Sequence, residues 1–406
     1  MKKPKIRFKG YQEDWEQRKL GELAEIVGGG TPSTSVDSYW DGDIDWYAPA
    51  EIGEQIYLKS SQRKITEEGL NKSSAKILPV GTVLFTSRAG IGKTAILLKE
   101  GCTNQGFQSI VPNKDKLDSY FIFTRSEELK RYGETVGAGS TFVEVSGKQM
   151  VSMELMMPTT MDEQQKIGEY FSNLDHLITL HQRKCEETKT LKKYMLQKMF
   201  PQNGHSVPEI RFSGFTEDWE QRKFGEIVQK YEDPVETPTE GYMRLGIRSH
   251  AKGTFHSYVE KGKELETAKM FRVAANNFIV NITFGWEHAV AITDESDAGK
   301  LVSHRFPQYS FKEGMNPRFF KYLILDECFR HHLELSSPGG AGRNRVLKLN
   351  EMLEYKMKFP QMEEQEEIAI YFEQLDKLIT LHHRKQNYVL NTLIYAKTTL
   401  FITKTS

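Results

Sequence analysis

The chain has 406 residues and carries 55 basic and 55 acidic side chains, so its formal net charge at pH 7 is zero. With 38% apolar and 27% charged residues, the composition excludes a disordered or fibrous protein and leaves room for two domains with separate cores. The zero net charge does not point to nucleic acid, although one basic face can coexist with acidic faces.

Targeting segments and cysteines add two further exclusions. No apolar run approaches the ~20 residues that cross a bilayer, and the opening MKKPKIRFKG lacks the apolar part of a signal peptide, so we expect a cytoplasmic protein. Cys102, Cys185 and Cys328 are far apart and form no CxxC pair. They therefore predict neither a disulfide framework nor a thiolate metal site.

The chain opens on a segment that returns half a chain later. Residues 4–26, PKIRFKGYQEDWEQRKLGELAEI, recur at 208–230 as PEIRFSGFTEDWEQRKFGEIVQK. Two interpretations of the shared EDWEQRK stay open: its tryptophans are core anchors beside a solvated charge run, or each copy is a docking site for a partner subunit. Recurrence of the whole charged run favours docking, because core packing alone would not require it. The candidate partner-binding residues are Trp15, Gln17, Arg18, Trp219, Gln221 and Arg222.

A long mixed segment follows each opening repeat, at 27–145 and 231–350. Short β-type runs separated by glycine and proline predict a compact α/β domain in each. The run at 81–96 lies over that at 277–292 with matching apolar positions, whereas Arg88 faces Phe284 and Lys93 faces Ala289. The two copies keep one scaffold and differ in their polar side chains. We therefore expect each copy to recognise a different surface of a target.

A long amphipathic helix is predicted to close each half. The segment at 161–184 is repeated at 362–385, and both carry apolar residues at spacings of three and four, with proline just before the start. Each helix extends over ~40 residues, or ~60 Å at 1.5 Å per residue. This length predicts an antiparallel coiled coil between the two helices, which would act as a spacer.

These elements together predict an α/β fold with two lobes related by an approximate two-fold axis and separated by the coiled coil. The expected parts are a first α/β domain with the first repeat at 1–157, a central long helix at 158–200, a linker at 201–207, a second α/β domain with the second repeat at 208–359, and a C-terminal long helix at 360–406.

The sequence motifs that catalysis would require are incomplete or missing. RAGIGKT at 88–94 resembles the end of a phosphate-binding loop, but the position that requires the first glycine is Ser87. The chain has no Pro-Pro, which an adenine methyltransferase loop needs, and no Pro-Asp, with which many nuclease metal sites begin. Zinc spacings such as HExxH are also missing. We therefore expect no catalytic residues and no metal ligands.

Base reading requires donors that match groove edges: arginine pairs with guanine, and asparagine or glutamine pairs with adenine. An ordinary solvated side chain remains the alternative for each candidate. In the first lobe the candidate DNA-binding residues are Thr31, Ser33, Thr34, Arg88, Lys93, Asn104, Gln105, Ser140 and Thr141. In the second lobe they are Arg244, Arg248, His250, Trp286, His304, Arg305, Arg343, Asn344 and Arg345.

The chain resembles, over almost its whole length, the specificity subunit of type I restriction-modification systems. The resemblance rests on WEQRKLGE and WEQRKFGE, on GGGTPSTSVDSYWDGDIDWYAP with TSRAGIGKTAI and TNQGFQSIVP, and on the helices that begin EQQKIGEYFSNLD and EQEEIAIYFEQLD. It implies two target-recognition domains, each of which reads one half of an asymmetric bipartite site in double-stranded DNA.

The resemblance also implies partners. Two methylating subunits would use S-adenosylmethionine and two restriction subunits would use ATP and magnesium, while this chain would bind no cofactor and carry no catalysis. Three other functions stay open: a coiled-coil scaffold that binds only proteins, a self-contained DNA methyltransferase, and a folded but inactive variant of the specificity subunit.

Overall fold

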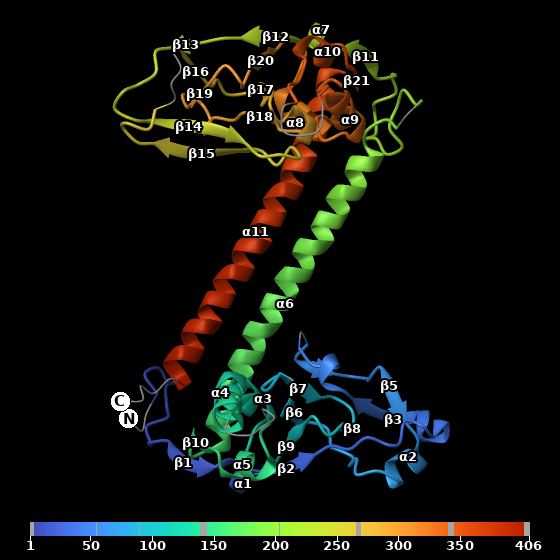
Figure 1. The fold of residues 1–406 in the computed structure, drawn as a ribbon, viewed down its shortest axis with the longest axis vertical. Helices are drawn as coiled ribbons and strands as arrows, with labels where there is room; N and C mark the ends of the chain where they lie inside the picture. The colour runs from blue at the N-terminus through green and yellow to red at the C-terminus, as the bar shows by residue number, and fades with distance from the viewer. Residues whose placement is uncertain are drawn as a thin grey trace. The chain divides into compact units, whose positions relative to one another are not determined.

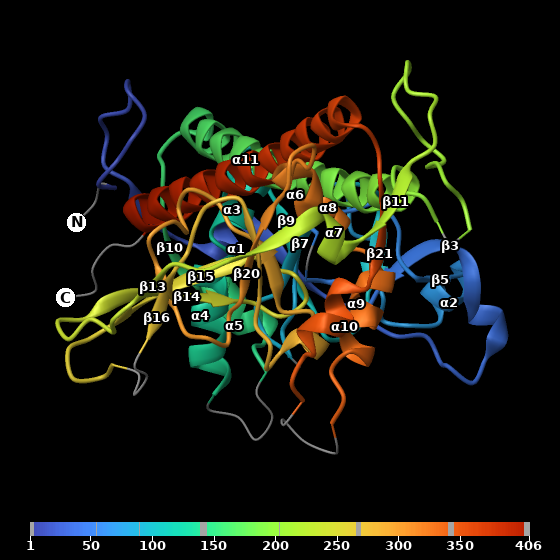
Figure 2. The ribbon, with the colours of Figure 1, turned by 90° about the horizontal axis from the view of Figure 1, so that it is seen from above.

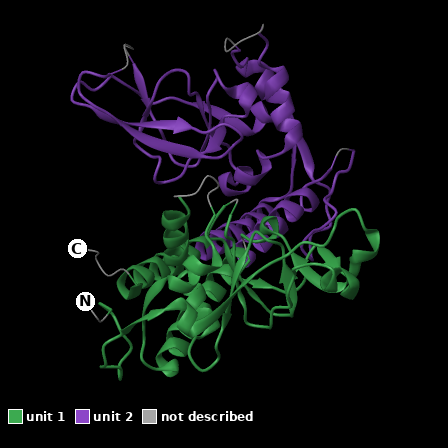
Figure 3. Cartoon of the chain, turned by 60° about the horizontal axis from the view of Figure 1, so that its bottom comes forward, with its two compact units in different colours: residues 1–182, 383–406 green, residues 183–382 purple. Residues whose placement is uncertain are grey.

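The computed structural model describes residues 4–53, 55–88, 90–138, 144–202, 204–264, 269–339 and 345–401. It divides into two compact units, which Figure 3 colours separately. Unit 1 comprises residues 1–182 and 383–406, and unit 2 comprises residues 183–382. The long helices α6 (Met161–Lys198) and α11 (Met362–Phe401) each contribute one part to each unit.

Unit 1 is built on two sheets and a short strand pair (Figure 1). The five-stranded sheet has the order β2 (Ala24–Gly28), β9 (Gln108–Pro112), β6 (Val83–Phe85), β7 (Thr94–Leu97), β4 (Tyr57–Leu58). The three-stranded sheet is β5 (Arg63–Ile65), β3 (Trp40–Tyr47), β8 (Gly101–Thr103), and β1 (Glu16–Lys19) pairs with β10 (Glu154–Met157). The short helices are α1 (Leu20–Leu23), η1 (Asp37–Tyr39), η2 (Pro49–Glu51), α2 (Glu67–Asn71), α3 (Ser119–Thr124), α4 (Ser126–Gly137) and α5 (Gly147–Ser152).

Unit 2 has the same kinds of parts. Its four-stranded sheet is β12 (Val228–Tyr231), β20 (Gln308–Phe311), β17 (Asn277–Val280), β18 (Val290–Ile292). Its five-stranded sheet is β13 (Pro234–Val235), β16 (Met270–Arg272), β19 (Leu301–Val302), β14 (Tyr242–Ile247), β15 (Thr254–Val259), and β11 (Glu220–Lys223) pairs with β21 (Lys356–Phe359). The short helices are α7 (Phe224–Ile227), η3 (Gly285–Glu287), α8 (Pro317–Leu323), α9 (Glu327–Leu335) and α10 (Leu349–Leu353).

Each unit contains its own copy of one sheet arrangement, which is called the shared sheet below. The order β2-β9-β6-β7 in unit 1 is repeated as β12-β20-β17-β18 in unit 2, with antiparallel pairing throughout. The equivalent strands β6 and β17 are fully buried, which explains why their apolar positions match while nearby polar positions differ. The faint correspondence between 81–96 and 277–292 is therefore a shared structural core. The units differ in the second sheet, which has other strands in another order.

Within each unit, segments of α6 and α11 lie side by side (Figure 2). In unit 1 the ring centroids of Phe171 and Phe401 are 5.9 Å apart, and in unit 2 those of Phe372 and Phe200 are 6.0 Å apart. Each pair joins the start of one helix to the end of the other, so the predicted antiparallel arrangement is confirmed within each unit. The predicted apolar stripe is buried or half-buried, except that Leu177 is 39% exposed.

The opening repeat of each half folds against the start of the helix that closes that half. Arg7 donates two hydrogen bonds to Glu163, at 2.6 and 2.7 Å, and Arg211 does the same with Glu364, at 2.8 and 2.7 Å. Both carboxylates are only 1% exposed. Such charges are tolerated in a core only when they are paired and hydrogen-bonded. These contacts explain why the two repeated segments occur together in each half.

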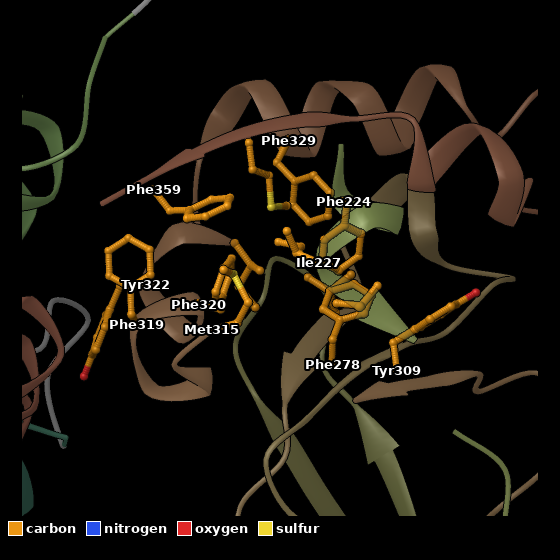
Figure 4. Packing of buried hydrophobic residues seen from close by; sticks show 14 of the residues in the cluster. Phe224, Ile227, Phe278, Tyr309, Met315, Phe319, Phe320, Tyr322, Phe329 and Phe359 are labelled. Atoms are coloured by element: carbon orange, nitrogen blue, oxygen red, sulfur yellow. The ribbon is translucent and has the colours of Figure 1, made fainter. Parts of the chain in front are cut away.

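Aromatic side chains fill the core of unit 2, part of which is shown in Figure 4. Phe224 of α7 packs edge to face on Phe278 of β17, with 4.9 Å between the ring centroids. Phe329 of α9 lies 6.0 Å from Phe224 and 6.3 Å from Phe278. The short helices α7 and α9 therefore pack on the sheet β12-β20-β17-β18 through contacts between aromatic rings.

Candidate nucleic-acid interface

Two tryptophans of β3 clamp the GGGTPSTS loop of unit 1. The indole of Trp46 donates to the carbonyl of Gly30 at 2.8 Å, and that of Trp40 donates to the carbonyl of Ser33 at 3.1 Å. The two rings pack edge to face at 5.2 Å, and the Arg63 guanidinium stacks 3.7 Å from the Trp40 ring. The exposed hydroxyls of the loop, on Ser33 and Thr34, are therefore carried by a fixed backbone.

A second loop approaches the first so closely that only glycine fits. A Cβ on Gly29 would lie 1.9 Å from the backbone oxygen of Asn104, and the backbone amide of Gly30 donates to Thr103 at 2.8 Å. Thr31 hydrogen-bonds Gln105 across the two loops. A Cβ on Gly106 would lie 3.0 Å from Asn104 Oδ1 and 3.7 Å from Arg88 Nε, so these two side chains are close to each other. Four candidate DNA-binding residues therefore lie together at this place: Thr31, Arg88, Asn104 and Gln105.

The loop that contains RAGIGK joins β6 to β7 as a tight hairpin. The Thr86 hydroxyl donates to Gly90 O at 2.7 Å and accepts from the Lys93 amide at 3.0 Å. A strand follows at Thr94, so no helix N-terminus is present here to hold a phosphate. Lys93 is exposed beside Gly53, where a Cβ would lie 3.8 Å from its Nζ.

In unit 2 the strands β14 and β15 form a hairpin that presents cations and an aromatic ring. Phe255 pairs with Gly246, and its ring occupies the space that a Cβ on Gly246 would need. The Arg248 guanidinium lies 5.2 Å from the same ring, and Arg244 lies farther along β14. Exposed arginines interleaved with an aromatic ring are typical of nucleic-acid binding.

The tip of this hairpin is held by the segment after η3. His250, with φ +61°, donates its amide to Glu287 O at 2.8 Å, and the amide of Ala251 donates to His288 O at 2.8 Å. His288 is buried, and its Nε2 lies 2.8 Å from the carbonyl of Ile324, which only accepts, so Nε2 carries the hydrogen. Burial lowers the pKa of His288, so the imidazole is neutral at pH 7.

A cavity of about 340 Å³ adjoins the hairpin. Its polar lining includes Arg244, Ser249, Asn281, Glu287 and Ser303. Its apolar lining includes Phe255, Phe284 and Phe306. The sequence did not nominate Phe255, Asn281 or Glu287. The pairing of Phe255 with Gly246 across the β14–β15 hairpin becomes visible only in the structure.

The other predicted residues of unit 2 lie near the same loops. His304 and Arg305 are exposed in the loop after β19, and the carbonyl of Arg305 accepts from the Ile282 amide at 3.0 Å. The indole of Trp286 donates to Thr283 O at 3.2 Å, and the Arg345 guanidinium lies 5.3 Å from its ring. Trp286 is thus half-buried in a packing contact. The predicted residues Ser140, Thr141, Arg343 and Asn344 lie outside the described residues.

The tryptophans of the two EDWEQRK motifs lie in the cores. Trp15 and Trp219 are each 4% exposed, which agrees with the core-anchor interpretation and leaves their rings inaccessible to a partner. Gln17 and Gln221 are exposed, and Arg18 and Arg222 are partly exposed. Docking through these four polar side chains stays a prediction.

Among the described residues, no three histidine, cysteine, aspartate or glutamate side chains are placed to hold a metal ion. Across the same residues, no helix combines the length and apolar character needed to cross a membrane.

Comparison with known proteins places this chain beside one group. The family model described as "Type I restriction modification DNA specificity domain" matches residues 12–190 and again 216–391. The type I restriction enzyme MjaIX specificity subunit of Methanocaldococcus jannaschii is 36% identical over 188 residues, which are 46% of this chain and 43% of that protein. The EcoR124I/EcoR124II specificity subunit of Escherichia coli is 29% identical over 180 residues, 42% of this chain and 43% of that protein. The chain thus spans less than half the length of either relative.

Other matches extend over nearly the whole chain. The MjaVIII specificity subunit of Methanocaldococcus jannaschii is 22% identical over 394 residues, 93% of this chain and 89% of that protein. The crystal structure of the S subunit of a type I restriction-modification system from M. genitalium superimposes with a TM-score of 0.59 at 12% identity, over 99% of this chain and 100% of that one. At that identity the likeness shows the fold alone.

Proposed function

This chain belongs to the family of type I restriction-modification DNA specificity domains, and from that premise we propose that each of its two units reads one half of an asymmetric, bipartite DNA site. The family model matches twice, and the two matches together cover most of the chain. The proposal therefore assigns one half-site to each of the two units.

The observation that carries this proposal is that one shared sheet supports two different polar surfaces. The sheet β2-β9-β6-β7 recurs as β12-β20-β17-β18. Unit 1 adds the GGGTPSTS loop with Thr31 and the neighbouring loop with Asn104 and Gln105, whereas unit 2 adds the β14–β15 hairpin with Arg244 and Arg248. Different donors on equal scaffolds read different base sequences. The resulting site is asymmetric.

We further propose that this chain carries no catalysis and directs partner subunits to the site. Two methylating subunits would use S-adenosylmethionine, and two restriction subunits would use ATP and magnesium. Support comes from the failed catalytic motifs in the sequence and from the membership of the family. The chemistry then belongs to the partners, while this chain supplies the choice of site.

Exposed apolar side chains on the long helices support a protein partner. In unit 1, Tyr388 and Tyr395 of α11 are 75% and 62% exposed; in unit 2, Tyr194 of α6 and Leu381 of α11 are 47% and 44% exposed. Large apolar side chains that are left exposed on a helix are available to pack against a protein partner. A scaffold that binds only proteins would use the same surface, but it would not need two different sets of exposed donors on one framework.

Expression in a methylation-free host together with a methylating subunit tests the proposal. Single-molecule sequencing of the host DNA is expected to show adenine methylation at one bipartite motif with an unread spacer. The methylating subunit expressed alone is the control and should leave the DNA unmodified. If the complex assembles and no motif is methylated, the DNA-reading function is refuted and the scaffold or the inactive variant is favoured.

A further inference from the structure

The cavity beside the β14–β15 hairpin contains one cation and one anion among its described lining residues, Arg244 and Glu287. The side chain of Arg244 is exposed, and its guanidinium makes no hydrogen bond or ion pair with the rest of the described chain. The Glu287 carboxylate is half-buried and accepts a 2.6 Å hydrogen bond from Ser249. The acceptor is therefore held in place, and the donor is free to meet a ligand.

The surroundings of the cavity are basic. Arg248 and Lys252 are exposed on the hairpin that supplies one wall, and His304 and Arg305 are exposed in the loop that supplies another. Such cations attract the phosphates of duplex DNA. A carboxylate among them would repel a phosphate, so Glu287 does not fit a phosphate site. It fits a group that donates hydrogen bonds, such as an exocyclic amine on a base edge.

The apolar walls of the cavity make the match between Glu287 and a hydrogen-bond donor more selective. Phe255 lies over Gly246, and Phe284 is 37% exposed at the rim. Because aromatic rings exclude water, a matched hydrogen bond inside the cavity contributes more binding free energy than it would in water. A base edge that leaves a polar group there unpaired loses binding free energy. In the major groove, guanine presents two acceptors that suit arginine, and cytosine presents an N4 amine that suits a carboxylate.

We propose that Arg244 and Glu287 read a single G·C base pair in the half-site of unit 2, with Arg244 on guanine O6 and N7 and Glu287 on the N4 amine of cytosine. Ser249 is a positioning residue that holds the carboxylate. This inference rests on the proposed function, since it names the base pair that one of the two reading surfaces recognises.

The test measures binding of the complex with its methylating subunit to duplexes that carry each of the four base pairs at every position of the site. Wild-type protein is expected to require G·C at one position of one half-site. The Glu287→Gln variant is expected to lose preference for that pair by about 5- to 150-fold, the equivalent of ~1–3 kcal/mol, while the other half-site stays unchanged. Arg244→Gln should lose the preference for guanine at the same position.

Glu295→Gln provides the matched control, because Glu295 is an exposed acid of unit 2 that does not line the cavity and has no partner among the described residues. Its base preferences should equal those of the wild type. Thermal unfolding of each variant shows that the fold is kept. A variant that does not fold is replaced by Ser249→Ala, which leaves both charges and should weaken the same preference.

The outcomes separate the inference from the function on which it rests. If the Arg244→Gln and Glu287→Gln variants both keep the wild-type recognition motif, the inference is overturned and the proposed function stands. A half-site pair without any G·C position also overturns the inference. Wild-type complex that binds all duplexes equally overturns both. If both variants lose the preference for G·C at the same position of one half-site, the assignment is supported.

Discussion

Replacement of Phe401 by alanine should destabilise unit 1, although this residue lies at the opposite end of the chain from the unit's first strand. The ring centroid of Phe401 is 5.9 Å from that of Phe171, 6.0 Å from Phe121 and 6.4 Å from Trp15. The Arg125 guanidinium lies 5.5 Å from the same ring. The last turn of α11 therefore completes the core that the opening repeat begins.

The magnitude follows from the burial. A fully buried phenylalanine costs about 3–5 kcal/mol when it is cut to alanine, and the ring of Phe401 is half-buried, so we expect about 2–3 kcal/mol. For a unit of this size, each kcal/mol lowers the melting temperature by roughly 2–4 °C. The melting temperature of unit 1 should therefore fall by about 4–12 °C.

Thermal unfolding of the full chain, with hydrogen exchange of peptides from each unit, is the assay. Peptides around Trp15 should exchange faster in Phe401→Ala, and those of unit 2 should exchange as in the wild type. Phe200→Ala removes the equivalent ring, which lies 6.0 Å from Trp219, and should affect unit 2 instead. Tyr395→Ala removes a ring of α11 that is 62% exposed and is the control. Equal effects of Phe401→Ala and Tyr395→Ala would refute the reasoning.

Three further results are expected. Arg7→Met leaves the Glu163 carboxylate, which is 1% exposed, without its guanidinium partner and should cost about 3–5 kcal/mol in urea unfolding. The double change Arg7→Met and Glu163→Leu should recover most of this loss, and no recovery would contradict a pure ion-pair loss. Burial lowers the pKa of His288 below its ordinary 6.5, so the unfolded chain binds the proton more readily than the folded one. Stability of unit 2 should therefore fall as the pH drops below about 6.5, and His288→Asn should flatten that dependence in melting curves between pH 7.5 and 5.5; equal slopes would contradict it. Gly29→Ala places a Cβ 1.9 Å from a backbone oxygen and should abolish recognition of one half-site in the methylation assay, whereas Gly28→Ala, whose nearest neighbour is 3.7 Å away, should keep the wild-type motif.

Local patterns predicted the long helices well. The spacing of three and four in each closing repeat predicts a helix over 158–200 and another from 360, and the structure has helices at Met161–Lys198 and Met362–Phe401. Periodicity is a local property, because each residue's face on a helix depends only on its position along the helix. The shared sheet was likewise visible as matching apolar runs, since fully buried strands tolerate little change in volume.

Candidate site residues were predicted less completely. Arginine, asparagine and glutamine were nominated by their donors, and the structure brings Thr31, Arg88, Asn104 and Gln105 together in unit 1. Glu287 was not nominated, because an acid argues against DNA until its place inside a basic rim is known. Which side chains share a cavity depends on the packing of segments that lie far apart in sequence.

The sequence by itself determined that the chain is a twofold repeat, that each half ends in a long amphipathic helix, and that the polar positions of the halves diverge. Only the tertiary structure decided how those parts are divided into units. Each sequence repeat contains one whole helix, yet unit 1 takes residues 383–406 from the second repeat and unit 2 takes part of α6 from the first. An amphipathic stripe states that a helix has an apolar face, but not which partner covers it. Antiparallel packing placed Phe401 beside Phe171 and Phe200 beside Phe372, so the end of each helix buries apolar surface in the core of the unit that the other repeat supplies.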